Sequence, residues 1–273
     1  GMWISCVDTS DLYHFVPVGD RFVARYPLTN AQYQRFLQAE DFAEKALWLD
    51  LPSFGSLAEG HPRRQARTWE AWAGWRWLQA ALKKPEYAAV DGRVEPLFWR
   101  DPRLGIAHPD APVVGVTWYE ANAYCRWLSK HWEELEEARA NQGLRPSEVR
   151  LLLESEWIAS AGGGQPPERF PWDAPGKVTR DLEEIMRRAN LRESGVERTS
   201  PVDRYPLGQS PLGVWDLAGN VWEWQANPAE RETIALRGGS WLYDAGTARL
   251  VSGYVAPPHA RWGDLGLRVA ALH

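Results

Sequence analysis

The sequence has 273 residues, of which 44% are hydrophobic and 25% are charged; this excludes a disordered or fibrous chain and predicts a packed core. The 31 Lys and Arg residues are outnumbered by 36 Asp and Glu residues, and the net charge of -5 argues against nucleic-acid binding. Only five of the basic residues are Lys, which favours a GC-rich genome and fits a thermophilic source.

The N-terminal region carries no targeting signal that can be read from the sequence. No run approaches the roughly 18 apolar residues of a membrane-spanning helix. Asp8 and Asp11 interrupt the chain before a secretory apolar segment forms. We therefore expect no membrane span or signal peptide, and a cytoplasmic or phage-borne protein.

The first predicted elements are a hairpin and a short helix. Residues 13–28 alternate apolar and polar side chains around a Gly-Asp turn, which indicates two antiparallel strands. Thr29 and Gln32 have the spacing of a capping box, so a helix carrying Tyr33 and Phe36 should follow.

Residues 38–111 are an elaboration between two helices. Within it, residues 66–84 predict a helix, with four apolar side chains on or near one side. These are Trp69, Trp72, Trp75 and Leu78. The flanking sequence is Pro-rich and irregular.

A second capping box is formed by Thr117 and Glu120. From Trp118 to Leu135 the apolar residues recur every three or four positions, which predicts one amphipathic helix. Cys125 lies in this stripe and is expected to be a buried structural thiol. With only Cys6 besides, the chain has no disulfide framework.

After Trp157 the sequence favours loops and short strands. Residues 221–224 alternate so that Trp222 and Trp224 share one face, which predicts a half-buried strand. Residues 235–241 and 265–269 predict two further strands on either side of a long loop.

Several ordered motifs resemble the formylglycine-generating enzyme, or sulfatase-modifying factor, family. They are YPLTNAQYQRFL (26–37), PVVGVTWYEANAYCRWL (112–128), RLLLESEW (150–157), FPW (170–172), GVWDLAGNVWEW (213–224), LRGGSW (236–241) and GLRV (266–269). The resemblance implies a C-type-lectin-like α+β fold with a small antiparallel sheet, two main helices and much irregular backbone. We expect one domain over 1–273, with 38–111 as an insert.

The resemblance also implies which metal ligands each enzymatic branch of this family requires. The oxidases that produce formylglycine carry two copper-binding cysteines shortly after the GGS motif, and the matching positions here are Tyr243 and Ala248. Because soft Cu(I) selects sulfur ligands, we expect no such activity. The sulfoxide synthases of the family hold iron with three histidines, and no His pair here has helical ligand spacing. A metal-dependent oxidase or sulfoxide synthase is the alternative function.

The family also carries calcium, and the resemblance places one site at Asn220 and Glu223. Carboxamide and carboxylate oxygens suit Ca²⁺, although an Asn in a Gly-Asn turn needs no metal. A second family site would use Asn190 and an Asp, but Ser194 stands where that Asp belongs. We expect no required cofactor, and a structural calcium as an option.

Residues 242–264 lie between two family motifs and contain no evident acid–base pair or nucleophile. Their mixture of aromatic and small polar residues is typical of recognition loops, although a solvent-facing loop without a role has the same composition. The layout resembles the variable proteins of diversity-generating retroelements, found in phages, prophages and bacteria. The resemblance implies variable positions at Leu242, Tyr243, Asp244, Gly246, Thr247, Ser252, Tyr254, Val255, His259, Trp262, Gly263 and Asp264, and scaffold positions at Arg249, Arg261, Gly266 and Arg268. The predicted function is therefore non-enzymatic display of a variable surface to an unknown protein or glycan ligand.

Overall fold

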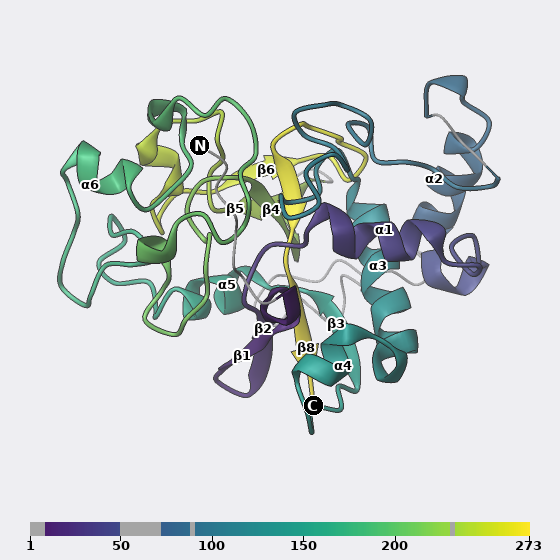
Figure 1. The fold of residues 1–273 in the computed structure, drawn as a ribbon, viewed down its shortest axis with the longest axis horizontal. Helices are drawn as coiled ribbons and strands as arrows, with labels where there is room; N and C mark the ends of the chain where they lie inside the picture. Colours follow the sequence, from purple (N-terminus) through teal and green to yellow (C-terminus); the bar gives the residue numbers. More distant parts are fainter. Residues whose placement is uncertain (1–8, 50–71, 88–90, 230–232) are drawn as a thin grey trace.

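The computed structural model describes residues 9–49, 72–87, 91–229 and 233–273. Its α-helices are α1 Asn30–Gln38, α2 Ala73–Ala81, α3 Trp118–His131, α4 Glu136–Ala140, α5 Glu154–Ser160 and α6 Leu182–Met186. Its strands are β1 Phe15–Val18, β2 Arg21–Ala24, β3 Glu148–Leu151, β4 Trp222–Pro228, β5 Ile234–Arg237, β6 Tyr254–Ala256, β7 Leu265–Leu267 and β8 Val269–Leu272. Long irregular segments connect them (Figure 1). The expected α+β class is confirmed.

Both predicted capping boxes are present. The Gln32 backbone N–H donates to the Thr29 hydroxyl at 3.2 Å, and the Thr29 N–H donates to the Gln32 side chain at 2.9 Å. At α3 the Glu120 N–H donates to the Thr117 hydroxyl at 3.1 Å, and the Thr117 N–H donates to Glu120 at 2.7 Å. These bonds satisfy backbone groups that a helix start would otherwise leave unpaired.

The long apolar stripe after Trp118 is not a single helix. α3 ends at His131, and Trp132–Glu134 forms a 3₁₀ turn before α4. The prediction of one continuous helix to Leu135 was therefore wrong, although Trp132 still reaches the core at 3% exposure. Cys125 is buried as expected, and burial raises the pKa of its thiol.

The insert contains a helix within the predicted range, but the four apolar side chains predicted on one side of it are not buried together. Within α2, Leu78 is fully buried and Trp75 is half-buried. Trp72 precedes the helix and is 43% exposed, with the Lys45 ammonium 3.9 Å from its ring centre. Trp69 lies outside the described residues.

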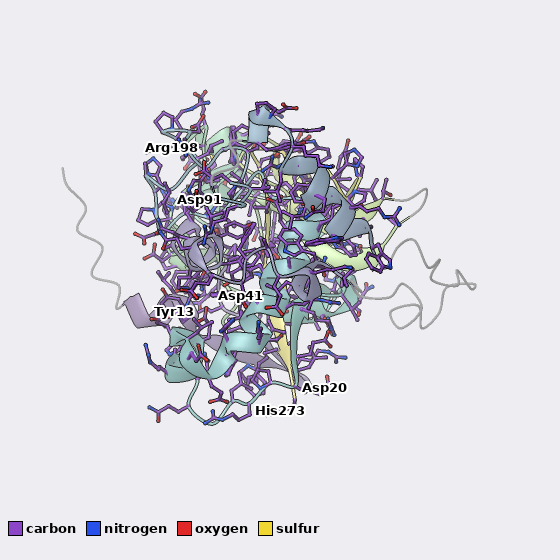
Figure 2. All side chains as sticks on the ribbon, turned by 90° about the vertical axis from the view of Figure 1, so that its right-hand side faces the viewer. Tyr13, Asp20, Asp41, Asp91, Arg198 and His273 are labelled. Atoms are coloured by element: carbon purple, nitrogen blue, oxygen red, sulfur yellow. The ribbon has the colours of Figure 1, made fainter. Side chains whose placement is uncertain are left out.

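Two four-stranded sheets form the centre of the molecule, where one small sheet was expected. The first has the order β1-β2-β8-β3 and is antiparallel throughout. Its hairpin tip at Asp20 and the chain end at His273 lie at the same end of the molecule (Figure 2). The second has the order β6-β5-β4-β7, in which β4 and β7 run parallel.

Strand β4 is more deeply buried than its alternation predicted. Val221 and Glu223 are each 1% exposed, as closely covered as Trp222 at 2% and Trp224 at 0%. The reason is electrostatic pairing: Arg268, between β7 and β8, donates to Glu223 at 2.8 Å, and both side chains are enclosed. A carboxylate this deep is tolerated because a guanidinium compensates its charge.

The largest hydrophobic cluster joins the insert to both sheets. It includes Trp48 and Leu78 from the insert, Trp127 from α3, and Trp224 and Val269 from the sheets. Because these residues share one core, the expectation of a single domain remains our interpretation of the architecture. Among the described residues, no helix is long and apolar enough to cross a membrane.

Candidate functional site

Residues 242–264 follow β5 and contain the short strand β6 at one edge of the second sheet. Of the twelve predicted variable positions, five are exposed: Leu242, Gly246, Tyr254, Val255 and His259. Six are half-buried: Tyr243, Asp244, Thr247, Ser252, Trp262 and Gly263. Val251, which the sequence did not single out, is 60% exposed. Most of the segment therefore offers side chains to solvent.

The same segment is fixed to the core by small or apolar residues between those positions. The buried set comprises Ala245, Ala248, Leu250, Ala256 and Ala260, each between 0% and 8% exposed. The loop thus alternates between buried anchoring residues and side chains that are at least partly exposed, of which Tyr243 and Trp262 also pack against the core.

Asp264 does not belong to the exposed set. It is 5% exposed, and its carboxylate accepts a 2.7 Å hydrogen bond from the Ser240 hydroxyl. Burial raises the pKa of this carboxyl. The preceding Gly263 is also constrained, since a Cβ there would lie 3.2–3.3 Å from the side chains of Leu104 and Phe98. Asp264 is therefore enclosed by the fold, and a side chain at Gly263 would require Leu104 or Phe98 to shift by a few tenths of an ångström.

An aromatic cluster joins β4 to residues 242–264. It consists of Trp222, Tyr243, Tyr254 and Trp262, and we use the name for these four residues. The Trp222 ring centre lies 5.9 Å from Tyr243 and 6.0 Å from Tyr254, and Tyr254 lies 6.1 Å from Trp262. Trp222 forms the buried base, and Tyr254 is 49% exposed. One contact is edge-to-face and two are tilted, and such contacts hold rings in defined positions.

The predicted scaffold residues all make contacts that fix the backbone. Arg261 is 8% exposed, donates to the Gly115 carbonyl at 3.1 Å and to the Glu95 carbonyl, and covers the Tyr87 ring at 4.5 Å. Arg249 lies 4.5 Å from the Phe170 ring centre and donates to the Glu168 carbonyl. At Gly266, a Cβ would lie 2.8 Å from a backbone carbonyl.

Arg237 is an anchor that the sequence analysis did not identify. Its guanidinium donates to the Leu250 and Ser252 carbonyls at 3.1 and 3.0 Å and pairs with Glu154 at 2.8 Å. The Arg of the LRGGSW motif was the available signal, but its partners lie 13 or more residues away. A local pattern cannot show such contacts.

The residues proposed for calcium are used within the protein. The Asn220 side-chain oxygen accepts from the Ser200 N–H at 3.0 Å and from Asn190 at 3.1 Å. Glu223 accepts from Arg268 and from the Trp157 indole N–H at 3.0 Å. A cation would have to displace a buried guanidinium, so these two side chains, as arranged, do not fit a calcium site.

The positions that match the copper ligands hold unrelated side chains. Tyr243 belongs to the aromatic cluster, and Ala248 is fully buried beside Phe170. Cys6 lies outside the described residues. Within the described ranges, no group of three or more His, Cys, Asp or Glu residues has an arrangement suited to a metal ion.

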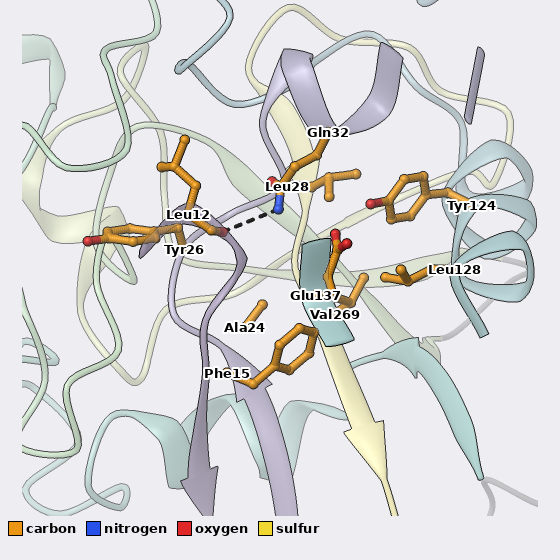
Figure 3. Close-up of a pocket in the computed structure, with 10 residues that line it drawn as sticks. All are labelled: Leu12, Phe15, Ala24, Tyr26, Leu28, Gln32, Tyr124, Leu128, Glu137 and Val269. Carbon is orange, nitrogen blue, oxygen red and sulfur yellow. Dashed lines mark hydrogen bonds between the residues drawn. The ribbon is translucent and has the colours of Figure 1, made fainter. Parts of the chain in front are cut away.

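Two hollows in the described part of the molecule lie away from residues 242–264. One of about 10 Å³ lies beside α3 and α4, and the Tyr124 hydroxyl and Glu137 carboxylate point into it (Figure 3). This is close to the space of one water molecule. A more open hollow of about 360 Å³ lies between α1 and residues 91–99. Neither is lined by residues 242–264.

Comparison with known proteins agrees with this architecture. The chain is 28% identical to the inactive C-alpha-formylglycine-generating enzyme 2 of Bos taurus over 90% of its length and 75% of the relative. It is 30% identical to the formylglycine-generating enzyme of Streptomyces coelicolor, covering 89% and 75%. It is 27% identical to a hercynine oxygenase of Mycolicibacterium thermoresistibile, covering 79% of this chain but 37% of that protein.

Among solved structures, Treponema denticola variable protein 1 superimposes with a TM-score of 0.54 at 20% identity, covering 93% of this chain and 84% of that one. The fold is therefore C-type-lectin-like, of the formylglycine-generating-enzyme type. The chain belongs to the family described as sulfatase-modifying factor enzyme 1-like, whose model matches residues 13–272.

Proposed function

We propose that this protein is a non-enzymatic display protein that binds a macromolecular ligand through the exposed side chains of residues 242–262. The observation that carries the proposal is the alternation within this segment. Buried residues such as Ala248 and Leu250 hold the backbone, while Leu242, Tyr254 and Val255 contribute 45–49% exposed side chains that the core does not use. A surface built in this way tolerates changes of side chain without loss of the fold.

The comparisons support this function without deciding it. A variable protein has the same fold, and a relative of similar length is described as inactive. The exposed aromatic rings are the kind of side chain that contributes most to binding energy at protein interfaces. Asp264 and Gly263 are left out of the variable surface because the structure packs both.

The alternative is a metal-dependent oxidase or sulfoxide synthase, which the enzyme relatives favour. The residues at the matching copper positions, Tyr243 and Ala248, do not supply thiolates, and a phenol and a methyl group cannot replace them for Cu(I). Incubation with copper and a cysteine-containing sulfatase peptide, followed by mass spectrometry, tests this alternative. We expect no aldehyde above the enzyme-free control.

The display function is tested by randomising codons and measuring folding. The library varies the five exposed positions Leu242, Gly246, Tyr254, Val255 and His259 on the surface of yeast. We expect most variants to remain resistant to protease and some to be selectable for binding to an unrelated protein such as lysozyme. A matched control library varies the buried positions Ala245, Ala248, Leu250, Ala256 and Asp264 and should lose most folded members. Equal loss in both libraries would refute the proposal.

Genomic context provides an independent test. A gene of this kind should lie near a reverse transcriptase and a near copy of the codons for residues 240–268, with differences at adenines of that copy. A gene beside a sulfatase and without such a copy would favour an enzymatic role.

A further inference from the structure

Many aromatic rings of this protein are already covered by its own cations. Lys45 lies 3.9 Å from the Trp72 ring centre, and Arg261 lies 4.5 Å from that of Tyr87. Within the described part of the chain, no Lys or Arg covers a ring of the aromatic cluster in this way. Its rings include the half-exposed Tyr243, Trp262 and the exposed Tyr254. The exposed parts of these rings are therefore not paired with a positive charge of the described residues.

A buried carboxylate lies near these rings. The Asp264 backbone carbonyl accepts from the Trp222 N–H at 2.8 Å, and burial, together with the charge of Asp264, raises the pKa of the Tyr243 phenol. Because Asp264 is 5% exposed, its field acts through a medium of lower dielectric constant than water and is felt more strongly. The nearby guanidiniums have carboxylate partners of their own: Arg192 pairs with the half-buried Asp244 at 3.3 Å, Arg237 with Glu154 at 2.8 Å and Arg261 with Glu120 at 3.7 Å. Asp264 forms no ion pair within the described residues, so its charge favours a cation at the rings.

We propose that the aromatic cluster binds an arginine or lysine side chain of a protein partner. This inference rests on the proposed function, because it specifies the ligand of the same face. The guanidinium or ammonium group would lie on the exposed rings, and its aliphatic stem would contact the adjacent Leu242 and Val255. The net charge of -5 also favours encounter with a basic protein surface.

The peptide acetyl-Gly-Arg-Gly-amide is the probe, and the same peptide with citrulline in place of Arg is its uncharged isostere. Saturation-transfer NMR titrations measure the binding of each to the full chain. We expect the Arg peptide to bind about three- to tenfold more tightly than the citrulline peptide, the size of one partly exposed cation–π contact. Equal binding, or no saturable binding of either peptide, overturns the inference.

Two variants of Tyr254 distinguish the contribution of its aromatic face to binding from that of its apolar surface area. Tyr254→Phe keeps the π-face and should retain the preference for Arg, whereas Tyr254→Leu keeps apolar area and should lose it. Tyr254 is 49% exposed, so both variants should fold, which their melting temperatures verify. Asp264→Asn should reduce the preference for Arg. Retention of the full preference in Tyr254→Leu contradicts the proposal.

A neutral sugar, methyl α-glucopyranoside, distinguishes a glycan ligand. If the protein binds this sugar in preference to the Arg peptide, and Tyr254→Leu abolishes that binding, the ligand is a glycan and not a cationic protein side chain.

Failure of this inference can be distinguished from failure of the display function. If the exposed-position library folds and yields binders but the Arg preference is absent, only the ligand class is wrong. If that library does not fold, the display function itself fails.

Discussion

Asp264 is a residue whose role depends on a contact distant in the sequence. Its hydrogen bond from Ser240 spans 24 positions, and its backbone carbonyl accepts from the Trp222 N–H at 2.8 Å. The resemblance to variable proteins grouped it with the exposed residues of the loop. Its carboxyl binds Ser240 and its backbone carbonyl binds β4, so Asp264 belongs to the structural base of the binding face.

The burial of Asp264 predicts a pH effect on stability. In the unfolded chain the carboxyl ionises near its ordinary pKa of 3.8, whereas burial raises the pKa in the folded state. The unfolded state therefore releases its proton first, and stability falls as pH rises above about 4 until the folded-state pKa is passed. Asp264→Asn lacks this loss, so its melting temperature relative to the natural chain should be higher at about pH 8 than at about pH 4.

Asp244→Asn is the control for this pH prediction. Asp244 lies in the same loop and caps the turn Ala245–Ala248 by accepting from the Gly246 N–H at 3.0 Å, a bond that Asn can also accept. Asp244→Asn therefore controls for the exchange of Asp for Asn in this loop at a side chain that the fold does not enclose. Identical profiles for the natural chain and Asp264→Asn would show that this carboxyl does not titrate as burial requires.

Truncation of a side chain in β4 should destabilise the protein strongly, whereas truncation of exposed side chains in residues 242–264 should have little effect. Trp222→Ala removes a ring that is 2% exposed and should lower the free energy of unfolding by about 3–5 kcal/mol. The triple variant Leu242→Ala, Val255→Ala and His259→Ala removes exposed side chains, each worth within about 0.5 kcal/mol. Urea denaturation of both variants measures the difference. A loss in the triple variant as large as that of Trp222→Ala would mean that the loop side chains belong to the core.

The elements that the sequence predicted well are those with local causes. The capping boxes at Thr29 and Thr117 need only residues three positions apart, and the hairpin before α1 needs only alternation and a turn. The end of α3 at His131 was not predictable, because the apolar stripe continues through a 3₁₀ turn. The burial of Glu223 in β4 depends on Arg268, which is 45 positions away. The candidate site shows the same division: its position followed from motifs, but its inward and outward side chains required the tertiary structure.

At the scale of the molecule, the insert and the binding loop are coupled through one side chain. Arg261 reaches the Glu95 carbonyl and the Tyr87 ring in the insert, and lies 3.7 Å from the buried Glu120 of α3. In the view of Figure 1, α2 lies beside α1 and α3 rather than as a separate body. The insert therefore supports the position of the loop as well as adding to the core.

This coupling predicts that the chain unfolds in one cooperative transition. Trp48 of the insert and Trp224 of β4 are both fully buried in the same hydrophobic cluster, so neither part can lose its core while the other keeps one. Calorimetry should give equal van't Hoff and calorimetric enthalpies. Trp48→Ala and Trp224→Ala should each lower the midpoint of that one transition, because each opens a cavity in the shared cluster. Two resolved transitions, with Trp48→Ala shifting only one of them, would show that residues 38–111 form a separate folding unit, and the single-domain interpretation would then be wrong.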